Sequence, residues 1–365
     1  MRWRVVVSSP RMEARCVRPI KQLSATDGDA RLEEAQYLYP QAMTCRYMHA
    51  VVLAGGYATR LWPITRHRPK MLLPVGETTV IDRILGSLES DERIENVYVS
   101  TNERFADTFA EHIDDRGYEK ARLSVEETTE ENEKFGVVGA LAQLVDREGV
   151  DDDLLVVAGD NLMGFDLDDF LDFYEGHDGP TIAAYDVGSR ERARSYGLVD
   201  LDGERVRDFQ EKPDDPKSTL VSICCYAFPE ESVRFEEYLS GDNNPDEPGW
   251  FIEWLQRKED VYAYSFDEPW FDIGTPEAYL EAVAWELDGE NRISDDAVVE
   301  NCTFGENVHV LGGVELTNVS LTDSVVFPGT EIERSDLARS IVDEHSHIED
   351  KDLVDSLVGS YSRLC

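Results

Sequence analysis

Hydrophobic and polar positions follow two different periods between residues 49 and 288. The apolar runs "HAVVLAG" and "DLLVVAGDN" are typical of buried strands, whereas "TVIDRILGSLES" repeats its apolar residues at helical spacing. Further strands are predicted over residues 94–101, 121–127 and 181–187, and further helices over 103–114, 136–146 and 167–177. This alternation predicts an α/β fold, a Rossmann-like mixed and mostly parallel sheet with helices on both faces. Ligands of such sheets bind beyond the carboxyl ends of the strands.

From about residue 290 the apolar residues recur every five or six positions, with small, polar or acidic residues between them. This spacing predicts a short left-handed parallel β-helix of hexapeptide repeats over residues 289–358, followed by a tail over 359–365. We expect the β-helix to pack on the preceding domain or to form an oligomer. The residues predicted to point inward are Ile293, Val299, Phe304, Val310, Leu316, Leu321, Phe327, Ile332, Leu337, Val342, Ile348 and Leu353.

Residues 1–47 differ from the rest of the chain, with weak periodicity and a basic composition. They hold eight Lys and Arg against five Asp and Glu, a net charge of +3. Because the whole chain carries −41, residues 48–365 carry −41 − 3 = −44. Met48 stands directly before the first predicted strand. Our hypothesis is that the natural chain starts at Met48 and that residues 1–47 are a poorly structured, mis-assigned extension. A basic targeting peptide is the alternative.

The overall charge is strongly acidic, with 76 Asp and Glu against 35 Lys and Arg and an isoelectric point near 4.4. Such charge repels nucleic acid and anionic membranes, so neither is expected as a partner. The acids are spread along periodic segments, which predicts a hydrated acidic surface typical of proteins from salt-loving organisms. An ordinary acidic cytosolic protein is the alternative.

No apolar run approaches the ~20 residues of a membrane helix, and no secretory signal is evident, so a cytoplasmic protein is expected. The six cysteines are scattered without a CxxC pair, a spacing that suits neither a zinc site nor a disulfide framework.

Positive charge is concentrated in the stretch "VVLAGGYATRLWPITRHRPKMLLP", which begins at residue 51. The strand ends at Gly55 and Gly56, where a backbone without side chains can approach a ligand and expose its amides. Thr59 adds a hydroxyl, and Arg60 and Lys70 add charge, which together describe a pocket for several phosphates. Neither a P-loop nor a GxGxxG motif is present. A strand and turn followed by a solvated basic patch is the alternative.

Asp160 ends the predicted buried strand "LLVVAGDN". A carboxylate at the carboxyl end of a strand is well placed to bind a metal. Taken alone, a strand-end aspartate more often caps the following helix. Glu211 and Lys212 follow a predicted hairpin turn at Asp202-Gly203, where they can also form a solvated ion pair.

The stretch "LAGGYATRLWPITRHRPKMLLPVG" resembles the signature of the sugar-1-phosphate nucleotidyltransferases, or nucleotide-sugar pyrophosphorylases. The family pattern is GGxGTRLxPxT followed by PK, and Ala58 stands where many members have a third glycine. The resemblance implies that Lys70 contacts the reacting phosphates. It also implies nucleotide binding by Leu53, Ala54, Gly55, Gly56, Thr59 and Arg60.

Further segments resemble the family in its order along the chain. "FGVVGALAQL" matches the segment that borders the nucleobase, which implies contacts from Gly136 and Gly139, although Val137 and Val138 depart from the pattern. "SICCYAFP" carries Cys224 in place of a usual glycine beside the sugar. The segment "SYGLVDLDGERVRDFQEKP" implies sugar-phosphate binding by Gly197, Glu211 and Lys212. The segments "LLVVAGDN" and "PWFDIGTPEAYLEA" imply Mg²⁺ binding by Asp160 and Asp272.

The implied reaction is Mg²⁺-dependent transfer of a nucleoside monophosphate from dTTP or UTP to glucose-1-phosphate, which gives a nucleotide sugar and pyrophosphate. Arg60, Lys70, Asp160 and Lys212 are the implied catalytic residues, and a homo-oligomer is expected. Alternatives are mannose-1-phosphate guanylyl transfer and a metal-dependent glycosyltransferase with a similar alternating fold.

Overall fold

The computed structural model describes residues 47–126 and 136–365. Residues 48–365 form one compact unit. The predicted basic extension lies outside the described residues except for Tyr47, as does Phe135 at the start of the predicted base-binding segment.

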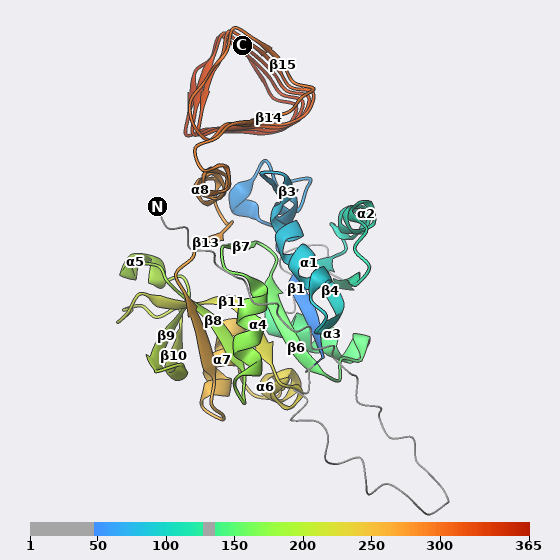
Figure 1. Ribbon diagram of the computed structural model, residues 1–365, viewed down its shortest axis with the longest axis vertical. Helices are drawn as coiled ribbons and strands as arrows, with labels where there is room; N and C mark the ends of the chain where they lie inside the picture. Colours follow the sequence, from blue (N-terminus) through green and yellow to red (C-terminus); the bar gives the residue numbers. More distant parts are fainter. Residues whose placement is uncertain (1–46, 127–135) are drawn as a thin grey trace, which may run out of the picture. The chain divides into compact units, whose positions relative to one another are not determined.

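A nine-stranded sheet crosses the first part of the described chain (Figure 1). Its strands are β1 (Met48–Leu53), β4 (Ile94–Asn102), β5 (Ala121–Glu126), β6 (Asp153–Ala158), β8 (Thr181–Asp186), β9 (Gly197–Asp202), β10 (Arg205–Glu211), β11 (Leu220–Phe228) and β12 (Tyr262–Phe266). They are ordered β5-β4-β1-β6-β11-β8-β12-β10-β9. Only β10 and β11 run against the other strands of this sheet, so the predicted mixed, mostly parallel sheet is confirmed.

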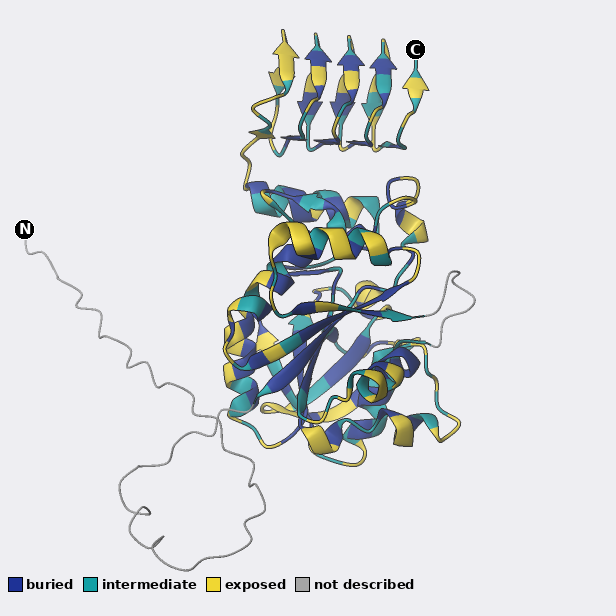
Figure 2. Cartoon of the chain, turned by 90° about the vertical axis from the view of Figure 1, so that its right-hand side faces the viewer, coloured by how far each residue is buried: buried dark blue, intermediate teal, exposed yellow. Residues whose placement is uncertain are grey.

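Helices cover both faces of the sheet because neighbouring strand residues point to opposite sides. Val52 on β1 joins a cluster with α1 (Val80–Ser90), α2 (Ala106–Arg116) and α4 (Leu167–Glu175). The preceding Val51 joins the opposite cluster with α3 (Val137–Glu148), α6 (Phe235–Leu239) and α7 (Pro248–Gln256). Figure 2 shows the buried sheet between partly exposed helices. The predicted arrangement of helices on both faces is therefore confirmed.

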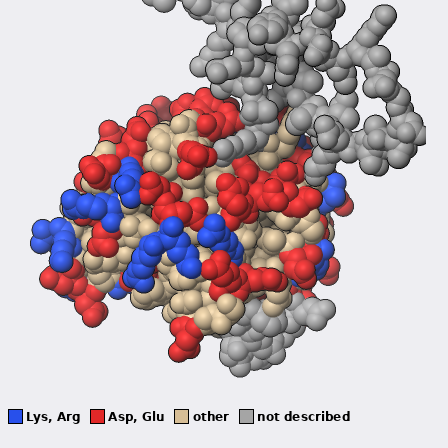
Figure 3. Space-filling model, turned by 90° about the horizontal axis from the view of Figure 1, so that it is seen from below, with Lys and Arg blue, Asp and Glu red and all other residues tan. Residues whose placement is uncertain are grey.

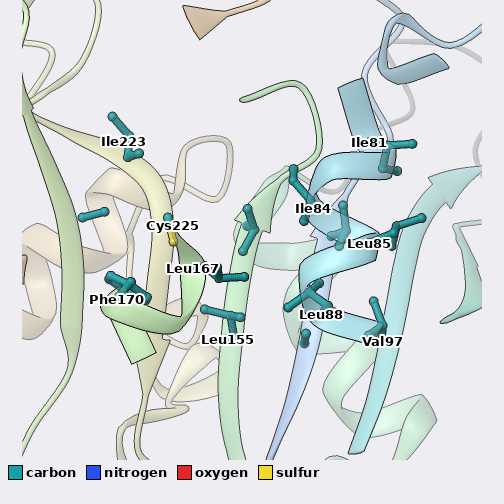
Figure 4. Packing of buried hydrophobic residues seen from close by; sticks show 14 of the residues in the cluster. Ile81, Ile84, Leu85, Leu88, Val97, Leu155, Leu167, Phe170, Ile223 and Cys225 are labelled. Carbon is teal, nitrogen blue, oxygen red and sulfur yellow. The ribbon is translucent and has the colours of Figure 1, made fainter. Parts of the chain in front are cut away.

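The first of these clusters is a continuous apolar layer (Figure 4). Leu88 of α1 and Phe170 of α4 are both fully buried in it, beside Leu155 of β6. The side chains of α1 that face the sheet recur at helical spacing, as the sequence pattern predicts.

Two helix starts bear on the predicted motifs. Thr275 caps α8 (Pro276–Leu287), because its Oγ1 accepts a hydrogen bond from the Ala278 amide at 3.2 Å, and Pro276 occupies the first turn as predicted. Asp160 does not cap the helix that follows it. Asp166 caps α4 instead, accepting from the Asp168 amide.

A parallel β-helix follows α8, and its strands stack in three sheets. Most steps between stacked strands are sixteen residues, as in the pairing of Glu315 with Glu331 and of Glu331 with His347. The predicted left-handed parallel β-helix is confirmed. Its strands are β14 (Arg292–Ile293), β15 (Val298–Glu300), β16 (Thr303–Phe304), β17 (His309–Val310), β18 (Glu315–Thr317), β19 (Ser320–Thr322), β20 (Val325–Val326), β21 (Glu331–Glu333), β22 (Asp336–Ala338), β23 (Ile341–Val342), β24 (His347–Glu349), β25 (Leu353–Val354), β26 (Leu357–Val358) and β27 (Arg363–Leu364).

Three details of the β-helix differ from the prediction. Phe327 does not point inward: the adjacent Val326 fills the interior, and Phe327 packs toward the sheet domain. Val299 is in register with the inward Leu316 but stays 39% exposed, because β15 is the end strand of its sheet. The predicted tail instead adds β27, since Leu364 stacks on Ile348.

The β-helix packs against the sheet domain through an apolar cluster. Leu61 and Ile64, which follow the Gly55-Gly56 turn, are buried there with Phe327 and Ile341 of the β-helix and with residues of α8. An ion pair reinforces this contact, as described below. Among the described residues, no helix has the length and apolar character needed to cross a membrane.

Candidate active site

A pocket of about 1030 Å³ opens where β1, β5 and β6 end, at the carboxyl edge of the sheet. This is the edge at which ligands of such sheets bind. Ala54, Thr59 and Gly139, which the sequence pattern also selected, are not among the lining residues. The predicted site residues that line the pocket are Leu53, Gly55, Gly56, Arg60, Lys70, Gly136, Asp160, Gly197, Glu211, Lys212 and Asp272.

The glycine turn after β1 is held by hydrogen bonds from neighbouring strands. The Gly159 amide donates to the Leu53 carbonyl at 2.9 Å, and the Asn102 side chain donates to the Gly55 carbonyl at 3.0 Å. These bonds leave Gly56 open, since a Cβ built there would meet no atom within 4 Å. The turn therefore presents fixed backbone to the pocket.

Ala58 occupies the position of the third glycine in the family pattern GGxGTRLxPxT. It adopts a left-handed φ of 49°, which costs an alanine roughly 1–2 kcal/mol. The Thr65 hydroxyl donates to the Ala58 carbonyl at 2.8 Å and fixes the turn in this conformation. The loop accommodates alanine with its left-handed geometry intact.

Two short strands bring distant acids together. β7 (Asn161–Met163) pairs with β13 (Trp270–Asp272) so that Asn161 lies opposite Asp272. The Ile273 amide also donates to the Asp160 carbonyl at 3.1 Å. Asp160 and Asp272 are therefore neighbours, although more than one hundred residues separate them in the sequence.

The charges around this acid pair are partly balanced. Burial raises the pKa of Asp272, and the negative charge of Asp160 raises it further, whereas Lys70 and Arg60 lower it. Lys70 is buried and forms an ion pair with the Asp160 carboxylate. The Arg60 guanidinium lies against Gly274, where a Cβ would come within 3.1 Å of it. Two neighbouring carboxylates form a donor set suited to a hard divalent cation.

Glu211 lies in a slot made by two glycines. A Cβ on Gly249 would sit 1.7 Å from Glu211 Oε2, and one on Gly197 would sit 2.8 Å from the same atom. Burial raises the pKa of Glu211 to about 7; Lys212 lowers the pKa, and Glu247 raises it. This carboxyl group therefore changes charge near neutral pH.

Lys212 reaches the pocket from an unusual backbone conformation. Its φ is 45°, and its amide donates to the Tyr196 carbonyl at 3.1 Å. Its ammonium pairs with Glu247, and both side chains are about two fifths exposed. The predicted hairpin is also present, because β9 and β10 pair antiparallel around Gly203.

Some residues of the pocket were not selected as site residues from the sequence. The Tyr196 hydroxyl donates to Asp272 Oδ2 at 3.4 Å, and burial raises its pKa to about 12. Arg192 and Arg194 also line the pocket from the segment around α5 (Arg190–Ala193). Cys224, which stands where the family usually has a glycine, lines the pocket as well. Burial together with the charge of Asp160 raises the pKa of Cys224, so it stays a neutral thiol.

Comparison with known proteins indicates one family for this chain. The sequence profile of the family described as "Nucleotidyl transferase" matches residues 49–288. A protein assigned as mannose-1-phosphate guanyltransferase in Sulfolobus acidocaldarius is 32% identical over 232 residues, 63% of this chain and 61% of that protein. The mannose-1-phosphate guanylyltransferase of Mycobacterium tuberculosis is 31% identical over 245 residues, 66% of this chain and 65% of that protein. The chain thus spans less than two thirds of the length of each of these relatives.

Among solved structures, the fold resembles a crystal structure assigned as glucose-1-phosphate thymidylyltransferase from Bacillus anthracis. The TM-score is 0.58 at 21% identity, covering 66% of this chain and 96% of that chain. At this identity the likeness supports the fold alone.

Proposed function

This chain belongs to the nucleotidyl transferase family, and we propose that it transfers a nucleoside monophosphate from a nucleoside triphosphate to a sugar-1-phosphate. The observation that carries the proposal is the shared pocket. It joins a glycine turn with Arg60 and Lys70 at one side to the Glu211 slot and Lys212 at the other, with the Asp160–Asp272 pair among the lining residues. Such a pocket suits two phosphate-bearing substrates held together.

The proposed reaction needs no nucleophile from the protein. A phosphate oxygen of the sugar-1-phosphate attacks the α-phosphorus in line and forms a new P–O bond. The bond between the α-phosphorus and its bridging oxygen breaks, and the electron pair leaves with pyrophosphate. Catalysis then rests on positioning and on charge stabilisation. Arg60, Lys70 and Lys212 offset the repulsion between the two anionic substrates.

We propose that Asp160 and Asp272 hold a divalent cation, Mg²⁺, which when bound would neutralise charge on the phosphates. The negative charge of Asp160 raises the pKa of Asp272, and a bound cation would offset that effect. The ion pair between Lys70 and Asp160 keeps a positive charge beside the same oxygens. Tyr196 orients the Asp272 carboxylate by donating to it.

Glucose-1-phosphate with dTTP or UTP is the substrate pair that we propose first. Mannose-1-phosphate with GTP is a second candidate that one residue favours. Glu126 ends β5 and lines the pocket beside Gly55, and the Ser100 hydroxyl donates to it at 3.3 Å. A carboxylate only accepts hydrogen bonds, and guanine offers an additional exocyclic amino donor that thymine and uracil lack.

The test is a pyrophosphate-release assay with dTTP, UTP and GTP, each paired with glucose-1-phosphate and with mannose-1-phosphate. The assay is run with Mg²⁺ at low and at molar KCl. We expect release that requires both substrates and that is much faster for one nucleotide than for the others. Glu126→Gln tests the base: it slows only the GTP reaction if the carboxylate reads guanine. A glycosyltransferase would instead release a nucleoside diphosphate when a nucleotide sugar replaces these substrates. No pyrophosphate release from any pair would refute the proposal.

A further inference from the structure

The last coil of the β-helix gathers a histidine, a glutamate and a cysteine on its outer surface. One ligand atom from each of His347, Glu349 and Cys365 lies within 4.8 Å of the other two. The strand period explains this grouping, because Ile348 on β24 points inward and its two neighbours therefore point outward. Ile348 stacks on Leu364, so the next residue along, Cys365, comes beside Glu349.

His347 is oriented as metal-binding histidines usually are. Its Nδ1 lies 3.0 Å from Glu331 Oε2 on the neighbouring strand β21, so an Nδ1 proton is donated to that carboxylate. The lone pair then lies on Nε2, which is buried and has no hydrogen-bond partner. A carboxylate behind a histidine fixes the ring in this way at many metal sites and makes it a better ligand.

The other two side chains are also held in place. Arg334 pairs with Oε1 of Glu349, and the second oxygen, Oε2, lies 3.7 Å from His347 Nε2. Bonds of 2.0–2.3 Å in a tetrahedral zinc site imply about 3.3–3.8 Å between ligand atoms, which this pair already meets. The Arg363 side chain donates to Cys365 Sγ at 3.4 Å and places positive charge beside the sulfur.

We propose that His347, Glu349 and Cys365 form a binding site for a divalent transition metal of the zinc class. Imidazole, carboxylate and thiolate are all zinc ligands, and water completes the tetrahedron. On binding, the Cys365 thiol loses its proton to solvent and the sulfur bonds to the metal. The site links β24 to β27, the strand stacked next to it, and so stabilises the last coil.

The spacing of the cysteines along the sequence indicated no zinc site, because that spacing does not show which residues lie beside one another on stacked strands of the β-helix. The step from Glu349 to Cys365 is sixteen residues, the same as one turn of this β-helix. Only that stacking brings the thiol to the histidine.

The test is a titration of the metal-stripped full chain with Co²⁺ and Zn²⁺, with excess Mg²⁺ present to occupy oxygen-only sites. Co²⁺ is expected to give a thiolate charge-transfer absorption band, and Zn²⁺ is expected to remove the band at one equivalent. His347→Ala and Cys365→Ser should abolish the band. Glu331→Gln, which changes only the residue behind the histidine, should weaken Zn²⁺ binding about 10- to 100-fold.

Matched controls are Cys302→Ser and His345→Ala, a thiol and an imidazole of the same β-helix outside the cluster. Both should bind Zn²⁺ as the unchanged protein does. Folding of every variant is checked by circular dichroism. A cobalt band that persists in Cys365→Ser, or equal Zn²⁺ affinity in the unchanged protein and His347→Ala, would overturn the proposal.

Discussion

Lys70 and Asp160 are the residues whose removal we expect to lower turnover most clearly if the proposed chemistry holds. Asp160→Ala and Lys70→Ala should each lower turnover by about two to three powers of ten, because each removes a charge that faces the reacting phosphates. The measurement is pyrophosphate release at saturating substrates, with the thermal melt recorded in parallel. Asp115→Ala, an exposed acid on α2, is the control and should leave the rate unchanged. Near-normal turnover in either pocket variant would exclude the assigned roles.

At position 249 the pocket has no room for any side chain larger than the hydrogen of glycine. Gly249→Ala places a methyl group 1.7 Å from Glu211 Oε2 and must displace that carboxylate. We expect the KM for the sugar-1-phosphate to rise by roughly 5- to 150-fold, equivalent to an overpacking cost of about 1–3 kcal/mol. Gly86→Ala, inside α1 with no atom within 4 Å of the new Cβ, should stabilise the protein slightly. Unchanged sugar kinetics in Gly249→Ala would contradict the slot described for Glu211.

Glu211 links stability to pH. Its pKa is about 7 in the folded protein against an ordinary value of 4.5, so the folded state holds the proton more tightly. Its contribution is complete below pH 4.5 and is lost as pH rises through 7. Glu211→Gln should therefore be more stable than the unchanged protein at pH 8, by up to about 3 kcal/mol, with the difference vanishing near pH 4.5. Urea unfolding at a series of pH values measures this.

The same ionisation should appear in sugar binding, if the charged carboxylate accepts the sugar hydroxyls. The KM for the sugar-1-phosphate should then fall as pH rises through about 7. A phosphate titrates near pH ~6, so Glu211→Gln supplies the reference in which only the substrate ionises. Parallel pH profiles for both proteins would show that Glu211 stays out of substrate binding.

Single residues differ in how far the sequence alone could predict them. The apolar run before Asp160 predicts its place at the end of a buried strand, but the choice between a metal ligand and a helix cap depended on the family resemblance. Asp272 could be predicted only through the family resemblance, since the β7–β13 pairing that brings it to Asp160 has no signal in spacing. Tyr196 and Gly249 were missed because their roles depend on contacts across the pocket. Tyr196, just before β9, contacts Asp272 of β13, and Gly249 of α7 lies against Glu211 at the end of β10.

At the scale of elements, the β-helix and the phosphate-facing segment are fastened together. Arg68 lies two residues before Lys70 and pairs with the buried Asp343 of the β-helix at 3.0 Å. Its guanidinium also lies over the Phe327 ring, 4.6 Å from the ring centre. The β-helix thus takes part in positioning a segment that lines the pocket.

Asp343→Asn should loosen this contact and raise the KM for the nucleoside triphosphate several-fold, because the neutral amide holds Arg68 less firmly. Steady-state kinetics and a thermal melt measure the two effects. Asp355→Asn is the matched control, since Asp355 pairs with Arg339 on the exposed surface of the same β-helix and should cost little. Equal kinetics for the two variants would show that the β-helix does not position the loop.

The elements themselves were largely predictable, since strands and helices differ in apolar period. One error arose where two adjacent residues are both apolar. Val326 and Phe327 fit the five-to-six-residue spacing equally well, and only the neighbouring domain decides that Phe327 points outward. The spacing of apolar residues predicts which residues are buried, but it does not predict which part of the protein they pack against.

At the scale of the whole molecule, acidic charge dominates. Asp and Glu cover much of the face shown in Figure 3, with Lys and Arg interspersed. The formal charge of −41 implies strong self-repulsion in dilute buffer. We expect the melting temperature to rise as KCl increases from about 0.1 M to about 2 M, where the Debye length falls below about 3 Å.

Differential scanning calorimetry across the KCl series tests this expectation. Sucrose at matched osmolality is the control, because it favours the compact state without screening charge. A melting temperature that is the same at low and molar KCl, or that responds equally to sucrose, would refute the salt-adapted interpretation.

The pairing of β7 with β13 also sets an order of events when the chain folds. The central strands β1, β4 and β6 can associate once the first half of the chain is available, but Asp272 reaches Asp160 only after almost the entire sheet domain has been synthesised. Contacts of such long sequence separation close slowly. Catalytic competence should therefore emerge after secondary structure during refolding, and a nascent chain released before residue 270 would hold a nearly complete sheet without a working centre.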